Sequence, residues 1–276
     1  MLDVALVTCA RVAQGDEDDH LLAGALTRLG LSVAFVCWDD PDARWPAAGM
    51  VVVRSTWDYH ERLDAFLDWA DYVGSVTALR NDAATIKWNS HKGYLLDLQG
   101  QGVEIVPTTL VRAGEQAELG PGELVVKPAV SVGAERTVRF ASQADLNALT
   151  ATDDTLIQPY VGAIETSGEL SIVCIDGEPS HAVRKVPASG DFRSQEEHGA
   201  HISLVELEAP HRSIARAALS TLERVPLYAR VDAVETDGRL QLMELELIEP
   251  TLWLRWHPPA ADRLAAAIEA QLTQSR

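Results

Sequence analysis

The chain has 276 residues, 47% of them hydrophobic, and a formal net charge of −18. That length supplies a sizeable core, and the acidic balance disfavours nucleic acids and anionic membranes as partners, because such surfaces bind through Lys and Arg. Three widely spaced cysteines in apolar runs favour buried thiols over a disulfide framework or a zinc site. No segment has the apolar length of a membrane span and no basic leader begins the sequence, so we expect a cytoplasmic protein.

The first 80 residues alternate strand patterns with helical ones. In chain order they predict a strand at 4–9, a helix from 16–19 to Gly30, a strand at 32–37, a short strand at 50–53 and a helix with its apolar stripe from Leu63 to Val73. Strands that are separated by helices favour a parallel sheet. We therefore expect an α/β domain over residues 1–80.

The loop after the short strand is a candidate substrate site. It carries Arg54, Ser55 and Asp58, and ligands of open α/β sheets bind beyond the carboxyl ends of the strands. An arginine fork suits a carboxylate and an aspartate suits an ammonium group, as in an amino-acid-like substrate. An alternative is equally well supported: Thr56 or Asp58 caps the next helix, and Trp57 belongs to the core.

A second unit begins after Leu79 and is richer in strands. The expected elements are a helix at 85–98 followed by Gly102, strands at 106–111, 124–127, 156–160, 170–176 and 180–185, a helix at 213–224, a hairpin over 230–247 and a final helix after Pro258 and Pro259. No internal repeat or low-complexity segment interrupts this order.

The hairpin near the C-terminus carries four charged residues at alternate positions. Arg230 and Asp232 lie on its first strand, Glu244 and Glu246 lie on its second, and the turn at 236–238 joins them. A three-residue loop there would pair Arg230 with Glu244 and place all four side chains on one face. Three carboxylates crowded together need a cation, and oxygen-only ligands suit Mg²⁺ that is shared with substrate phosphates.

Alternate charges on a hairpin are more often the solvated face of an antiparallel sheet. The flanking residues argue against that interpretation here. In 228–234 and 240–248, apolar residues occupy both faces, as expected of strands that are covered on each side. Buried charges need partners, so we interpret the four residues as part of a nucleotide site.

The common nucleotide, zinc and hydrolase motifs are absent from the sequence. The order of its residues instead resembles the ATP-grasp ligase superfamily, in which two lysines, a mobile loop, a hinge strand and an acidic metal cluster clamp ATP between two lobes. This resemblance runs from about Asn81 to the C-terminus. The whole chain also resembles the branch of O-ureido-serine cyclo-ligases and ribosomal-protein glutamate ligases, through 53–59, 180–183, 191–193 and 244–250.

The resemblance implies a pre-ATP-grasp domain on the substrate side over 1–80, then an α+β ATP-grasp fold with a small lobe over 81–160 and a C-terminal lobe with the metal site over 161–276. Two lysines would offset the charge of the triphosphate, a loop at 129–134 would cover it, and a hinge and a glutamate would hold the adenine and ribose. The ATP-binding residues implied are Lys92, Lys127, Ser131, Gly133, Gln158, Tyr160, Val161 and Glu169.

The same resemblance implies that Asp232, Glu244 and Glu246 bind two Mg²⁺ ions, for which Mn²⁺ can substitute. Glu249 is an alternative to Glu246. The implied catalytic residues, on the acyl-phosphate and γ-phosphate side, are Arg230, Arg193 and Lys185. For any one basic residue taken alone, an ordinary surface position is the simpler interpretation.

The implied activity is ATP-dependent, ADP-forming ligation of a small amino-acid-like substrate, whose carboxylate becomes an acyl phosphate that a nitrogen then attacks. The nitrogen belongs either to a second molecule, giving a dipeptide-type product, or to the same molecule, closing a ring in specialised metabolism. A small-molecule kinase and a non-catalytic binding module on the same fold are alternatives. No nucleic-acid or membrane partner is expected, and a homo-oligomer is left open.

Overall fold

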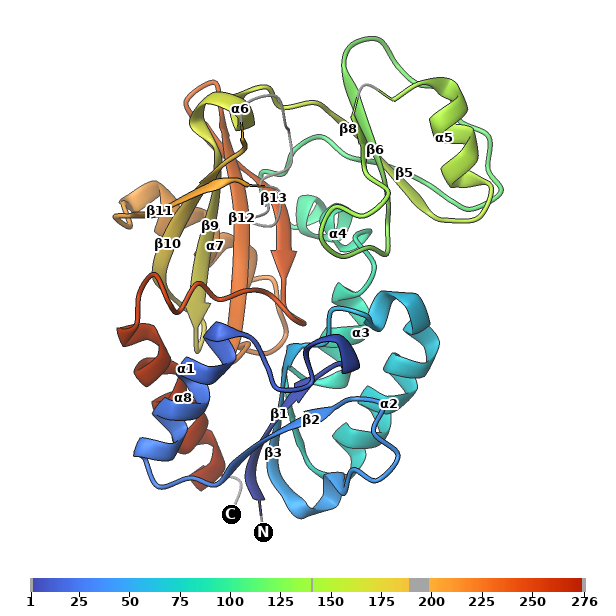
Figure 1. The fold of residues 1–276 in the computed structure, drawn as a ribbon. Coiled ribbons are helices and arrows are strands. Elements are labelled where there is room, and N and C mark those ends of the chain that lie inside the picture. Colours follow the sequence, from blue (N-terminus) through green and yellow to red (C-terminus); the bar gives the residue numbers. More distant parts are fainter. Residues whose placement is uncertain (1, 140, 189–198, 275–276) are drawn as a thin grey trace.

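The computed structural model describes residues 2–139, 141–188 and 199–274. Three sheets organise this part of the chain, in the orders β2-β1-β3-β4, β5-β8-β6-β7 and β11-β10-β9-β12-β13 (Figure 1). The first sheet lies below the last one in this view and the two form the main body, whereas the second sheet stands to one side at the upper right. This is the expected α/β unit followed by an α+β fold of two lobes.

The N-terminal sheet is parallel and is covered on both faces by helices. Leu6 and Val52 pack with the residues of α1, whereas Val7 and Val53 pack with those of α2, because successive side chains of a strand point to opposite faces. Asp16 caps α1 by accepting from the backbone N–H of Asp19. The elements are β1 (Leu2–Thr8), η1 (Ala10–Val12), α1 (Glu17–Arg28), β2 (Val33–Cys37), η2 (Trp45–Ala47), β3 (Ala48–Ser55), η3 (Tyr59–Arg62), α2 (Leu63–Val76) and β4 (Ala78–Arg80).

The small sheet is antiparallel and one helix covers it. Leu146 and Leu149 of that helix pack on Val126. A reciprocal capping box between Ser142 and Asp145 begins this helix, which was not among the predicted elements. The elements are β5 (Thr109–Val111), β6 (Leu124–Pro128), β7 (Val138–Arg139), α5 (Gln143–Thr150) and β8 (Thr155–Pro159).

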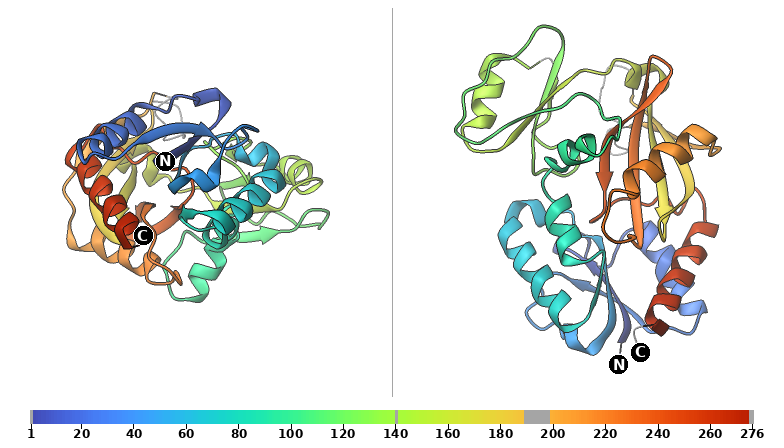
Figure 2. Two further views of the ribbon diagram at one scale, coloured as in Figure 1. Left: turned by 90° about the horizontal axis from the view of Figure 1, so that it is seen from below. Right: turned by 180° about the vertical axis from the view of Figure 1, so that it is seen from behind.

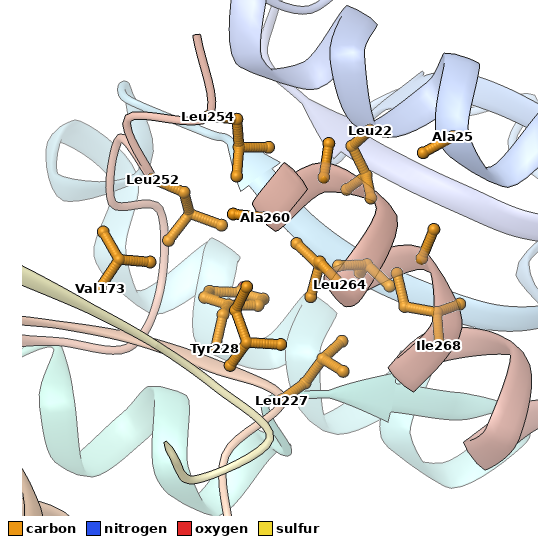
Figure 3. Packing of buried hydrophobic residues seen from close by; sticks show 14 of the residues in the cluster. Leu22, Ala25, Val173, Leu227, Tyr228, Leu252, Leu254, Ala260, Leu264 and Ile268 are labelled. Carbon is orange, nitrogen blue, oxygen red and sulfur yellow. The ribbon is translucent and has the colours of Figure 1, made fainter. Parts of the chain in front are cut away.

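The large sheet is antiparallel, and the final helix joins it to the N-terminal sheet. Val173 and Tyr228 lie on the sheet face that meets Leu264 of this helix, and Leu22 of α1 lies on the opposite side of it (Figure 3). The two chain ends consequently lie close together (Figure 2). The elements are α6 (Ala163–Ser167), β9 (Glu169–Ile175), β10 (Glu178–Val186), β11 (His201–Val205), α7 (Ala209–Leu219), β12 (Tyr228–Thr236), β13 (Arg239–Glu246) and α8 (Pro259–Gln274).

Two predicted helices have different limits in the structure. The helix expected at 85–98 is broken into α3 (Ala83–Asn89) and α4 (Tyr94–Gly100), because the backbone N–H of Lys92 leaves the helical pattern and donates to the carbonyl of Ala129, 2.7 Å away. The helix expected at 213–224 is α7, which begins earlier because Pro210 occupies its first turn.

The predicted hairpin is present, but its turn and its register differ from the expectation. Asp237 and Gly238 form a two-residue turn, both with positive φ. Such a turn alone would place Met243 opposite Asp232. A bulge at this point restores Glu244 to that position, and Arg230 then pairs with Glu246 instead of Glu244. The register error is two residues, and the side-chain period is two, so the charged residues still share one face.

Candidate active site

A cavity of about 600 Å³ lies between the small and the large sheet, and loops of the N-terminal domain form one of its ends. β6 and β8 line one wall and β9, β10, β12 and β13 line the other. The expected ATP, metal and catalytic residues that line it are Lys92, Lys127, Ser131, Gly133, Gln158, Tyr160, Val161, Glu169, Lys185, Arg230, Asp232, Glu244 and Glu246. Arg193 lies outside the described residues.

Arg230 bridges two of the acidic residues. Its Nη2 lies 2.9 Å from Oδ2 of Asp232 and donates also to Glu246. The hydroxyl of Ser171 donates to Asp232 from the neighbouring strand. Burial opposes ionisation of Asp232, but the charges of Arg230 and Lys185 outweigh it and lower the pKa of that carboxyl. Asp232 and Arg230 are therefore fixed as an ion pair on the cavity wall.

Two lysines pair with carboxylates of the large sheet, one from across the cavity and one from the same wall. Lys127 of the small sheet donates to Oε1 of Glu244 over 2.6 Å, which connects the two lobes. Burial raises the pKa of Glu244, but Lys127 and Lys92 together reduce it to about 2. Nζ of Lys185 lies 3.1 Å from Oε1 of Glu169 and 3.8 Å from Oδ2 of Asp232.

Among the described residues, the carboxylates on this wall outnumber the cations that face them. Burial, followed by the charges of Asp232 and Glu244, raises the pKa of Glu246 to about 7 although Arg230 opposes the change. Burial and the charge of Glu246 raise the pKa of Glu249 to about 8. Such shifts mark uncompensated negative charge in a protected place, where a bound cation is favoured.

The acidic residues do not form a ready-made metal cage. In the described parts of the chain, no three His, Cys, Asp or Glu side chains converge closely enough to hold an ion. Asp232 and Glu244 are occupied by Arg230 and Lys127 instead. The donor set nevertheless fits a hard divalent cation, because it consists of carboxylate oxygens on one wall with surplus negative charge.

The loop at 129–137 is closed against the N-terminal domain. Lys92 donates from Nζ to the carbonyl of Ser131 over 2.6 Å, and His60 of the N-terminal domain lies 2.8 Å from the carboxylate of Glu135. Val132 packs with the hydrophobic cluster of α2. The expected phosphate loop therefore contacts both Lys92 and the substrate-side domain.

The expected adenine end lies along β8. Gln158 donates to the hydroxyl of Thr108 over 2.9 Å, and the guanidinium carbon of Arg139 lies 3.8 Å from the centroid of the Tyr160 ring. The backbone N–H of Tyr160 donates to the carbonyl of Glu123, 2.8 Å away. Since that amide is engaged within the lobe, recognition of a base edge would fall to other groups of the hinge.

The three residues expected to bind substrate do not line the cavity. Arg54 is 2% exposed, and it donates to Asp19 and to the carbonyl of Pro250, each over 3.0 Å. Ser55 also donates to Asp19, and Asp58 accepts from the indole of Trp38 over 2.9 Å. The expectation is corrected accordingly: these side chains make their hydrogen bonds inside the protein, where they join β3 to α1 and to the segment after β13, although Nη1 of Arg54 is buried without a hydrogen-bond partner among the described residues.

The N-terminal domain contributes other residues to the cavity. The same loop lines it through Trp57, Tyr59 and His60. The core was one of two expected places for Trp57, and no role was predicted for Tyr59 or His60. Arg11, Asp16, Glu17 and Arg255 complete that end. Burial and the neighbouring charge of Asp19 raise the pKa of Asp16 to about 6. For those of the N-terminal domain the sequence signal was their position beyond the carboxyl ends of β1 and β3, whereas Arg255, which follows β13, carried no such signal.

Two family models match the chain. "D-cycloserine synthetase DcsG, N-terminal domain" matches residues 4–81, and "Prokaryotic glutathione synthetase, ATP-grasp domain" matches residues 103–253. The cycloserine biosynthesis protein DcsG of Streptomyces lavendulae is 30% identical over 98% of this chain and 98% of its own length. The glutathione synthetase of Rhodopseudomonas palustris is 28% identical, over 65% of this chain and 58% of its own length.

Solved structures agree with these matches. The crystal structure of D-cycloserine synthetase DcsG superposes with a TM-score of 0.87 at 28% identity, over 98% of this chain and 99% of that one. D-alanine–D-alanine ligase of Bacillus anthracis shares the fold, with a TM-score of 0.69 at 14% identity over 99% and 98% of the two chains. No helix in the described residues is long and apolar enough to cross a membrane. ATP and a divalent metal are the cofactors that the family implies. The chain belongs to the ATP-grasp ligases, and it carries the N-terminal domain of the D-cycloserine synthetase group.

Proposed function

We propose that this ligase activates the carboxylate of a small amino-acid-derived substrate and closes a ring with a nitrogen of the same molecule. The observation that carries the proposal is the extent of the similarity. The cycloserine protein matches 98% of the chain, and residues 4–81, whose loops form one end of the cavity, match the N-terminal domain model of D-cycloserine synthetase, whereas the glutathione synthetase model matches residues 103–253. Shared substrate-side architecture favours a shared reaction type.

The chemistry proceeds in two balanced steps. An oxygen of the substrate carboxylate attacks the γ-phosphorus, the bond to ADP breaks, and an acyl phosphate forms. The nitrogen then attacks the acyl carbon, inorganic phosphate leaves and the nitrogen loses a proton. We assign Lys92 and Lys127 to the triphosphate, and Arg230 with Lys185 and Arg193 to the reacting phosphoryl and acyl groups, because cations there offset charge that develops in the transition state.

We assign the metal site to Asp232, Glu244 and Glu246, with Glu249 beside them. Two Mg²⁺ ions, or Mn²⁺ in their place, would neutralise the phosphates and the surplus carboxylates when bound. In this proposal the carboxylate of Glu244 would bind the metal in place of the ammonium group of Lys127. Lys127 would then be available to bind phosphate. We assign the adenine and ribose to Gln158–Val161 and Glu169, and the covering loop to Ser131 and Gly133.

The substrate end is proposed at the N-terminal loops. Asp16 and Glu17 at the start of α1 suit an ammonium group, and Arg255 suits a carboxylate. Arg255 lies beside Trp253, with 5.6 Å from its guanidinium carbon to the ring centroid, and it pairs with Glu17 over 3.2 Å. Arg230 reaches the same segment, 3.4 Å from the carbonyl of Thr251. Substrate and phosphoryl group would thus meet at Arg230.

An ADP-release screen with product masses tests the proposal. Amino acids, dipeptides and amino acids bearing ureido or hydroxylamine groups are offered with MgATP. Ring closure by dehydration gives a product lighter than its single substrate by one water. A joined product from two molecules would instead establish intermolecular ligation, to which the glutathione synthetase match points, and a stable phosphorylated product would establish a kinase.

A further inference from the structure

The strand that carries Glu244 and Glu246 lies at an edge of the large sheet. β12 bonds one side of β13, and near Leu242 the other side is bonded by the backbone of Glu104 and Val106. Beyond the bulge that backbone partner ends. The outward-facing groups of the strand are then the N–H and C=O of Leu245 and Leu247, which need partners because both residues are buried.

Side chains of one short segment satisfy all four of these groups. Asn89 donates to the carbonyl of Leu245 and accepts from the N–H of Leu247, each over 2.8 Å. Tyr94 accepts from the N–H of Leu245 over 3.0 Å, and Asn81 donates to the carbonyl of Leu247 over 2.8 Å. The amide of Asn89 therefore replaces the two hydrogen bonds that a neighbouring strand would make.

The two leucines whose backbone is bonded by these side chains are next to the carboxylates of the acidic wall. Glu246 lies between Leu245 and Leu247, and Glu244 precedes them. Asn89 is 7% exposed and occurs three residues before Lys92, and both line the cavity. A shift of the backbone at Leu245 would move both carboxylates relative to that lysine. Contacts that position metal ligands have a large effect on metal affinity, because the affinity depends on the geometry of those ligands.

We propose that Asn89 is a positioning residue, which fixes β13 against the segment of Lys92 so that Glu244 and Glu246 meet the metal and the phosphates together. The inference deepens the proposed function and rests on its assignment of the metal ligands. Tyr94 supports the same strand through its hydroxyl, whereas its ring packs on Trp88 with centroids 5.2 Å apart.

The experiment measures binding of ADP and of MnADP by calorimetry. The affinity for MnADP divided by the affinity for ADP reports the contribution of the metal site, and no turnover is needed. Asn89→Ala is expected to reduce that ratio about tenfold, since lost positioning around metal ligands weakens binding by about 10 to 100-fold. Tyr94→Phe is expected to reduce it less, because it removes one acceptor and keeps the ring. Leu272→Ala, in α8 and away from β13, controls for destabilisation and should leave the ratio unchanged.

An unchanged ratio in Asn89→Ala and Tyr94→Phe overturns the inference. If Asn89→Ala does not fold, Tyr94→Phe decides, because it is nearly isosteric. A ratio that falls equally in Leu272→Ala also overturns it, since general loss of stability would then explain the effect. A wild-type protein that prefers MnADP but closes no ring refutes the proposed function alone. One that closes a ring while both variants keep the wild-type ratio refutes the inference alone.

Discussion

Glu249→Gln should stabilise the metal-free protein at high pH. Glu249 has a folded pKa of about 8 against an ordinary value of 4.5, because of burial and the charge of Glu246. A raised folded pKa means that the folded state holds a proton which the unfolded state has released. Stability from this group is complete below about pH 4.5 and is lost as the pH rises through about 8. Glutamine carries no charge and escapes that loss.

The size of the effect follows from the same values. Each pKa unit corresponds to about 1.4 kcal/mol, so the whole displacement would amount to about 5 kcal/mol. Glu249 is only partly buried and solvent screens its charge, so we expect about 2 kcal/mol at pH 8.5 and little change at pH 5. The sign is a gain in the free energy of unfolding for the variant.

Urea unfolding in EDTA at the two pH values measures this gain, with extrapolation to zero denaturant. Glu235→Gln, at an exposed position of β12, is the matched control and should change stability little at either pH. Equal effects of Glu249→Gln at pH 5 and pH 8.5, or destabilisation at pH 8.5, would show that the pKa of Glu249 is not raised in the folded protein. Repeating the titration with MgADP should remove most of the pH dependence, since metal binding favours the ionised carboxylate.

Three further outcomes test the site and its scaffold. Glu244→Gln should lower ADP release about 100-fold with an unchanged circular dichroism spectrum, because it removes a proposed ligand at constant shape; full activity would exclude Glu244 from the metal site. Lys127→Met should lower kcat/KM for ATP by about 100 to 1,000-fold in steady-state assays, and a normal value would contradict its phosphate role. Arg54→Leu should reduce the free energy of unfolding in urea by about 3 to 5 kcal/mol, because Asp19 stays buried without its partner; an effect near zero would show that Asp19 finds another.

The face of the acidic hairpin was predictable, whereas its register was not. Side-chain alternation along each strand depends only on sequence parity, so it placed Arg230 and Glu246 on one face correctly. The exact pairing depends on φ at Asp237 and on the bulge at Met243, and several turn types fit the same residues. The local pattern therefore predicted which charged residues share this wall, but it did not predict how they pair.

The loop after β3 shows which features local sequence patterns do not predict. Its position after β3 was foreseen, and the loop does line the cavity. Which of its side chains face inward depends on Asp19, which is 35 positions away in sequence and takes up Arg54 and Ser55. The break between α3 and α4 has a similar origin, because the carbonyl of Ala129 recruits the N–H of Lys92. Long-range partners of this kind leave no periodic signal.

The length of the turn at the tip of the acidic hairpin and the bulge at Met243 are expected to change together in evolution. A tip of two residues keeps the carboxylates on the nucleotide side only if an extra residue is accommodated further along the strand. A tip of three residues does so only without that extra residue. Insertions and deletions in related enzymes should therefore occur here as compensated pairs, and a homologue that breaks this rule should have lost its acidic wall.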